Sequence, residues 1–221
     1  MAAKDGIGVM KGREDDKIPS SQVGGSRLLS LREAMVIADV AERQHFIRQD
    51  VADGVYEPLS IRHDVDSYRR YDWVSALIFA AIYGNRLLIC DQVLRAHVAG
   101  RLYLAALHNL RDMDNRPCPT DVVQIDKYLA IPLGAVWRVV KPRVDLYRKG
   151  LSRIREDVAH LPEGARFRFS GVLVEEAARL GEDGEDIENI LADYLYLSED
   201  DISFARLYVR ACLVMDWPCR S

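Results

Sequence analysis

The carboxylates are the side chains best suited to catalysis or metal binding in this 221-residue chain. Acidic runs occur between Glu182 and Asp186 and between Glu199 and Asp201. Both runs lie where helices are expected to begin, and the helix dipole stabilises negative charge there. The nearby pair Asp64 and Asp66 has metal-ligand chemistry, but the sequence places no third ligand. Helix capping therefore explains the two acidic runs without catalysis.

Motifs of the common enzyme classes are absent from the sequence. There is no glycine-rich phosphate loop, no serine nucleophile elbow and no His-x-x-x-His pair. The cysteines lack C-x-x-C pairs and the Cys/His spacing of tetrahedral zinc sites, so reduced thiols are expected at Cys90, Cys118, Cys212 and Cys219. We therefore predict a binding protein and not an enzyme, with no catalytic residue, metal or cofactor.

Polar side chains suited to reading DNA gather on one expected helix, at residues 41–52. Val40, Ile47 and Val51 are expected to form the face of this helix that packs on the core. Because each residue turns the helix by 100°, the polar side chains then lie on the outer face or beside it. Arginine suits guanine and glutamine suits adenine in the major groove. An ordinary solvated helix face is the alternative. The candidate DNA contacts are His45 and Gln49 on the outer face, Arg48 on its flank, and Arg43 and Gln44 near the helix start.

A second basic cluster surrounds a polar turn between two expected short strands, at residues 59–62 and 67–71. It fits phosphate contacts from the wing of a winged helix, and a solvated hairpin is the alternative. Its members are Arg62, His63, Arg69 and Arg70. Residues 28–116 contain eleven Arg against twelve Asp and Glu, so DNA binding requires clustered charge and favours a dimer.

The elements that position these residues have clear boundary signals. Ser30 and Glu33 form a capping box for a first helix, which Asp39 interrupts, and Gly54 ends the second helix. Two short helices joined by a tight turn indicate a helix-turn-helix. Asp-capped helices are then expected at residues 73–83 and 91–110.

The middle of the chain predicts a strand at residues 122–131 and then a long helix. Its apolar residues recur at steps of three and four, which is typical of a buried seam: Leu133, Val136, Val140, Val144, Tyr147, Leu151, Ile154 and Val158. Packing against the C-terminal module and contact between two copies are both open interpretations. Pro142 inside the seam predicts a kink or break.

The C-terminal part predicts a short strand at residues 166–169 and three short helices. Residues 163–216 contain thirteen Asp and Glu against five Arg, so this module is acidic and poorly suited to nucleic acid. We predict a mainly α protein with minor β. It has a flexible arm at 1–27, a winged helix-turn-helix at 28–116, a connecting strand and helix at 117–158, and a small helical module at 159–221.

The acidic module resembles a known family, the antitoxin-associated domain of unknown function that accompanies PIN-like toxins. The matching segments are EDIENILADY at 185–194, LSEDDI at 197–202 and ARLYVRA at 205–211. The N-terminal half is similar to the helix-turn-helix of longer VapB-type antitoxins. The family's Gly-Thr-Arg turn is missing, and residues 169–174 replace it with a shorter segment.

This resemblance implies a type II antitoxin that neutralises a PIN-like ribonuclease toxin and represses its own operon by binding operator DNA. It implies toxin contacts at Arg206, Arg210, Trp217 and Arg220, and a homodimer or a larger complex with the toxin. A stand-alone regulator whose C-terminal module only oligomerises is the first alternative, and an adaptor without a DNA role is the second. Without a long apolar run or a signal-peptide core, a cytoplasmic location away from membranes is expected.

Overall fold

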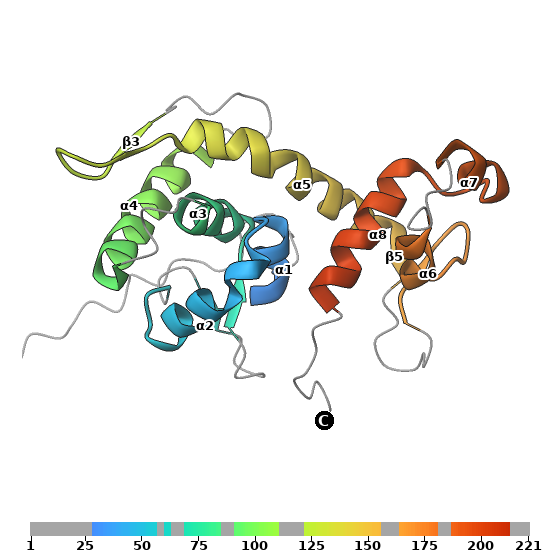
Figure 1. The fold of residues 1–221 in the computed structure, drawn as a ribbon, viewed down its shortest axis with the longest axis horizontal. Coiled ribbons are helices and arrows are strands. Elements are labelled where there is room, and N and C mark those ends of the chain that lie inside the picture. The colour runs from blue at the N-terminus through green and yellow to red at the C-terminus, as the bar shows by residue number, and fades with distance from the viewer. Residues whose placement is uncertain are drawn as a thin grey trace, which may run out of the picture.

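The computed structural model of the chain describes residues 28–56, 60–62, 69–84, 91–110, 122–155, 164–180 and 187–212. These residues form a mainly helical fold with short antiparallel strand pairs, as the sequence predicted (Figure 1). The predicted arm at 1–27 and the linker at 112–120 lie outside the described residues. No helix in the described part of the chain has the length and apolar character to cross a membrane.

The predicted helix-turn-helix elements are present at the expected positions. Helix α1 (Leu31–Ile37) starts with the capping box, in which the Glu33 amide donates to Ser30 Oγ at 3.2 Å and the Ser30 amide to Glu33 Oε2 at 2.7 Å. Asp39 turns the chain with a φ of 60°. A 3₁₀ turn, η1 (Ala41–Arg43), then leads into α2 (Gln44–Ala52). Gly54, at a φ of 80°, ends α2 as predicted.

A hairpin and two helices complete the N-terminal half. Strands β1 (Ser60–Arg62) and β2 (Arg69–Tyr71) pair antiparallel, and Leu29 extends the pairing onto Tyr71. Asp72 accepts a hydrogen bond of 2.9 Å from the Ser75 amide and so caps α3 (Trp73–Tyr83). Asp91 likewise accepts from the amide of Leu94 at 3.1 Å at the start of α4 (Gln92–Leu110). Both predicted caps are confirmed.

The single strand predicted at residues 122–131 is wrong, because this segment is a hairpin. Strand β3 (Val123–Gln124) turns back and pairs with β4 (Ala130–Ile131). Asp126 causes the reversal, since its Oδ1 accepts from the amides of Tyr128 at 2.7 Å and Leu129 at 2.9 Å. Such a carboxylate turn competes with a continuous strand.

Helix α5 (Leu133–Arg153) runs unbroken through Pro142, so the predicted break is wrong. Buried residues on both sides of the proline, Val140 and Val144, hold the helix by packing, which offsets the cost of about 3 kcal/mol for an interior proline. The helix also ends earlier than predicted. Ile154 lies in strand β5 (Ile154–Arg155), and Val158 lies outside the described residues.

The C-terminal part has the predicted strand and three short helices. Strand β6 (Arg166–Phe167) pairs with β5, and α6 (Val174–Arg179), α7 (Ile187–Asp193) and α8 (Glu199–Cys212) follow. The amide of Ser198 donates to Asp201 Oδ2 at 2.8 Å, which confirms the predicted cap of α8.

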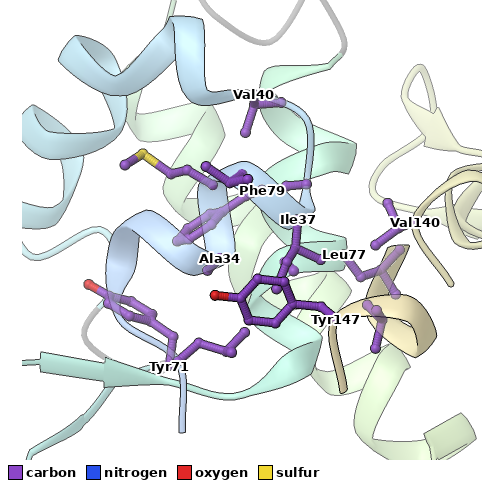
Figure 2. Packing of buried hydrophobic residues seen from close by; sticks show 14 of the residues in the cluster. Ala34, Ile37, Val40, Tyr71, Leu77, Phe79, Val140 and Tyr147 are labelled. Atoms are coloured by element: carbon purple, nitrogen blue, oxygen red, sulfur yellow. The ribbon is translucent and has the colours of Figure 1, made fainter. Parts of the chain in front are cut away.

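One apolar core joins the two halves of the chain. Buried residues from Leu29 to Ala211 form a single cluster, and Figure 2 shows Tyr147 of α5 among residues of α1 and α3. Helix α8 packs against α1, α5 and α6. The seam residues Leu133, Val140, Val144 and Tyr147 are therefore buried within one chain, as the intramolecular interpretation predicted.

Candidate nucleic-acid interface

The outer face of α2 is the strongest candidate for contact with a ligand. His45, Arg48 and Gln49 are exposed, whereas Arg43 and Gln44 are half-buried. Ile47 is fully buried on the opposite face. The predicted orientation of this helix is therefore confirmed. An exposed row of donors and acceptors on the second helix of a helix-turn-helix is the arrangement that reads base edges.

Three of these side chains already have neighbours within the chain. Gln49 Nε2 donates to Asp53 Oδ2 at 3.0 Å, and Gln92 Nε2 donates to the same oxygen at 2.6 Å. These two hydrogen bonds lower the pKa of Asp53, so its carboxylate stays charged. Gln44 Oε1 accepts from Arg32 Nη1 at 3.5 Å, and Arg43 Nε lies 4.0 Å from a Glu42 carboxylate oxygen. Of the candidate contacts on α2, His45 and Arg48 are the most accessible.

A buried polar network contacts the core-facing side of α2. Asp50 is fully buried, and Arg95 of α4 donates to both its oxygens, at 2.5 Å from Nε and 2.7 Å from Nη2. The Tyr83 hydroxyl of α3 also donates to Asp50, at 2.6 Å, and itself accepts from the Tyr56 hydroxyl at 2.9 Å. A two-pronged guanidinium–carboxylate pair fixes both distance and angle. The network therefore sets the orientation of α2 against α3 and α4.

The ionisation states in this network are fixed by burial and by charge. Burial raises the pKa values of Tyr56 and Tyr83 far above their ordinary range, so both hydroxyls remain protonated donors. The hydrogen bonds to Asp50 raise the pKa of Arg95, which is only 6% exposed. Sequence reasoning missed this network. The available signal was Asp50, a carboxylate three residues after the buried Ile47 on the core face.

The Arg32 side chain of α1 makes hydrogen bonds to both α2 and α8. Arg32 Nε donates to the Arg210 carbonyl at 2.9 Å, and Arg32 Nη1 points to Gln44. Burial lowers the pKa of the Arg32 guanidinium, the charges of Arg48 and Arg210 lower it further, and Cys212 acts in the opposite direction. Arg32 thus connects the start of α2 to the backbone at the end of α8. The sequence gives no sign of this connection.

The other candidate toxin contacts have different positions. Arg206 is on α8, and its guanidinium donates to the carbonyls of Ala178 at 3.4 Å and Leu180 at 2.7 Å. It therefore satisfies the C-terminal end of α6. Trp217 and Arg220 lie outside the described residues.

The predicted wing is described by its backbone alone. The register pairs Arg62 with Arg69 and Ile61 with Arg70, which places three of the candidate phosphate contacts on one hairpin. The fourth, His63, lies outside the described residues.

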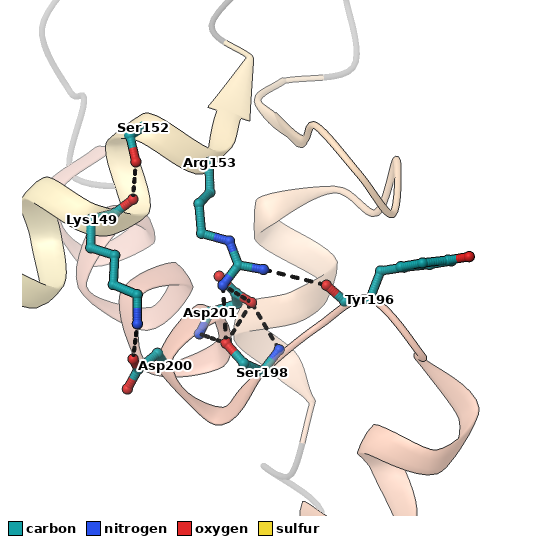
Figure 3. Close-up of polar contacts among 7 residues, drawn as sticks. All are labelled: Lys149, Ser152, Arg153, Tyr196, Ser198, Asp200 and Asp201. Atoms are coloured by element: carbon teal, nitrogen blue, oxygen red, sulfur yellow. Dashed lines mark hydrogen bonds and ion pairs between the residues drawn. The ribbon is translucent and has the colours of Figure 1, made fainter.

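The acidic start of α8 is used for internal contacts. Arg153 of α5 forms a 2.9 Å ion pair with Asp201, which is 1% exposed, and Lys149 pairs with Asp200 at 2.6 Å (Figure 3). Arg153 also donates to Ser198 Oγ at 3.3 Å and to the Tyr196 carbonyl at 3.5 Å. These carboxylates cap α8 and join it to α5.

Large apolar side chains remain exposed on the C-terminal module. Leu195 and Tyr196, in the connection between α7 and α8, are 81% and 67% exposed, and Phe169 is 75% exposed. Single exposed apolar residues are common, but two adjacent ones beside an acidic helix start fit a protein-binding surface.

Among the described residues, no group of three or more His, Cys, Asp or Glu side chains is arranged to hold a metal ion. Comparison of this chain with known protein families, curated proteins and solved structures found no match.

Proposed function

We propose that this protein binds DNA through its helix-turn-helix, with α2 as the recognition helix. The observation that carries the proposal is the pairing of an exposed polar face on α2 with a rigid buried support behind it. His45 and Arg48 project away from the core, while Asp50 on the other face is held by Arg95. A preorganised helix loses little conformational entropy when it enters a groove.

The charge distribution also supports DNA binding. The net charge is −4, which argues against a diffuse electrostatic attraction to phosphates. Positive charges are instead gathered locally on the β1–β2 hairpin, where the strand register brings together Arg62, Arg69 and Arg70. In this proposal the hairpin contacts the backbone beside the groove that α2 occupies.

A mobility shift with the DNA upstream of the gene tests this function. Arg48→Ala and Gln49→Ala remove candidate base contacts, each of which contributes about 1–3 kcal/mol of discrimination. We expect weaker retention for both variants than for wild type. Arg179→Ala, which removes an exposed arginine on α6, is the matched control and should bind as wild type does. Unchanged retention of both test variants would remove α2 as the recognition helix.

We further propose that the C-terminal module binds a PIN-like ribonuclease toxin, as the resemblance to VapB-type antitoxins implies. The exposure of Leu195 and Tyr196 supports a protein partner at this module. In this proposal Arg206, Arg210, Trp217 and Arg220 are the candidate toxin contacts. An arginine placed among the toxin's metal-binding carboxylates would occupy its active site as a two-pronged cation. The complex would repress the operon more tightly than the antitoxin alone, through added valency.

Co-purification with the product of the neighbouring gene tests the antitoxin function. We expect a stable complex, relief of the growth arrest that the neighbour causes, and weaker capture by Leu195→Ser than by Val93→Ser, a control at an exposed position on α4. No complex and no relief of arrest would contradict this role.

A stand-alone regulator remains the alternative function. Its C-terminal module would only oligomerise, and the α5 seam is already buried within the chain. Oligomerisation would therefore use another surface. Light scattering on the purified protein distinguishes the two, since a dimer that Leu195→Ser dissociates, together with no captured neighbour, favours the regulator.

A further inference from the structure

The β3–β4 hairpin projects from the body of the molecule beside α4 and the start of α5 (Figure 1). Its own side chains fix its shape. Asp126 Oδ1 holds the turn through two backbone amides, and Gln124 Nε2 donates to the Leu129 carbonyl at 3.4 Å. Arg101 Nη2 of α4 donates to the Gln124 carbonyl at 3.5 Å and so links β3 to α4. The hairpin therefore presents a defined surface.

Apolar side chains occupy both faces of this hairpin. Ile125 and Ile131 are buried on the inner face. Because side chains alternate along a strand, Val122 and Ala130 lie on the outer face, where both are exposed, Val122 by 54%. Tyr128 in the turn is 84% exposed. An antiparallel hairpin with one face in water normally carries polar residues there, so this outer face is suited to a contact.

The surroundings of the outer face are also apolar or internally bonded. Gln124 lies on this face, but its amide nitrogen donates within the hairpin. Leu104 of α4 follows Arg101 by one helical turn and is 58% exposed, so it lies on the side of α4 near the hairpin. Contiguous apolar surface of this kind is typical of a protein–protein contact.

The charges of the hairpin favour a second copy of this chain as the partner. Residues 122–131 contain one acid, Asp126, and one base, Lys127, so the segment is neutral within a chain of net charge −4. A different partner selected by charge would require an excess of one sign, which this segment lacks. Two copies carry the same net charge, and they repel each other least where a neutral segment lies between them. Neighbouring charges of opposite sign also suit a two-fold axis, which places like surfaces together.

We propose that the β3–β4 hairpin is the contact between two copies of this chain, in which Val122 and Tyr128 pack against the hairpin of the second copy about a two-fold axis. A two-stranded hairpin is marginally stable by itself and gains from added packing. The seam of α5 is buried within one chain and does not compete for this role. The inference depends on neither DNA nor toxin binding. A dimer would nevertheless present two copies of α2, the symmetry that a palindromic operator requires.

Sedimentation equilibrium of the full-length protein over a range of concentrations tests the contact. We expect wild type to dimerise. Tyr128→Ser should raise the Kd of the dimer about tenfold or more, because a tyrosine at the centre of an interface contributes strongly and is lost twice about a two-fold axis. Phe169→Ser is the matched control, since Phe169 is 75% exposed in the C-terminal module. It should dimerise as wild type does.

A second variant tests the charge argument without changing the apolar face. Lys127→Glu gives the hairpin two negative charges and removes the ammonium group that lies 4.5 Å from the centre of the Tyr128 ring. We expect a weaker dimer at low salt and partial recovery at high salt, which screens the repulsion between the two copies. Both substituted residues are exposed, so circular dichroism should show the helical content of wild type.

Three results would overturn the proposal. They are a wild type that stays monomeric at every concentration, a dimer that Tyr128→Ser leaves intact, and a dimer that Phe169→Ser weakens as much as Tyr128→Ser does. The mobility shift that tests DNA binding has a separate readout, so failure of this contact and failure of the proposed function are distinguishable.

Discussion

The residues that hold α2 in place lie on its buried face. A carboxylate with no solvent exposure, Asp50, holds a guanidinium and a tyrosine hydroxyl from two other helices. Removing one partner of such a buried pair leaves an uncompensated charge, which costs far more than the net value of the pair. The support of α2 therefore depends on a few polar atoms.

We predict that Asp50→Ala lowers the free energy of unfolding by about 3–5 kcal/mol, because Arg95 stays buried without its partner. Urea denaturation measures this loss. Asp53 lies three residues after Asp50 and is exposed, so Asp53→Ala is the control. It should show no comparable loss of unfolding free energy. Equal destabilisation by the two substitutions would mean that the network does not hold α2.

A second prediction concerns Asp72, the N-cap of α3. Burial raises the pKa of this carboxyl above its ordinary value, and hydrogen bonds from Ser75 only partly oppose the shift. A raised folded pKa means that stability is fully present below the unfolded value of about 3.9 and is lost as the pH rises through the folded value. Asp72→Asn keeps a capping oxygen without the charge.

Urea midpoints measured from pH 3 to pH 7 check the sign of this effect. Relative to Asp72→Asn, the wild-type protein should lose stability over the acidic part of this range and then hold a constant difference. A wild type that gains on the variant as the pH rises would show that the cap favours the charged form.

At the scale of elements, local chemistry predicted most helices but not their partners. Capping residues such as Ser30, Asp72 and Ser198 identify helix starts because each acts within three residues of its own position. The hairpin at Asp126 was missed because its turn depends on one side chain within an alternating pattern. The break at Pro142 was wrong because packing from distant helices decided the outcome.

The contact between α5 and α8, which are distant in the sequence, leads to a further prediction. Helices α5 and α8 approach closely at Gly150, where an added Cβ would lie 2.0 Å from Cγ of Phe204. Gly150→Ala should therefore lower the free energy of unfolding by about 1–3 kcal/mol through overpacking.

Gly100 provides the matched control for this substitution. It lies within α4, and an added Cβ there meets nothing within 4 Å. Gly100→Ala should stabilise the protein by up to about 1 kcal/mol, because alanine favours a helix over glycine. Chemical denaturation of both variants tests the contrast, and a Gly150→Ala protein as stable as Gly100→Ala would contradict the close approach of α5 and α8.

At the scale of the whole molecule, the charge pattern along the sequence does not favour nucleic-acid binding. The sequence has a net charge of −4 and an acidic C-terminal region. Folding uses several of those carboxylates internally, as Asp201 does with Arg153. The orientation of α2 could be predicted from periodicity. The hydrogen bond from Arg32 to the end of α8 could not, because it depends on where α8 meets α1.

If α2 reads a DNA sequence, the protein binds that sequence more tightly than a scrambled one. Affinities of the full-length protein are measured at physiological salt for its upstream DNA and for a scrambled duplex of the same composition. We predict that wild type binds the upstream DNA at least about 10³-fold more tightly, and that Arg48→Ala lowers this ratio while Arg179→Ala keeps it. Equal affinity of wild type for the two duplexes would contradict sequence reading by α2.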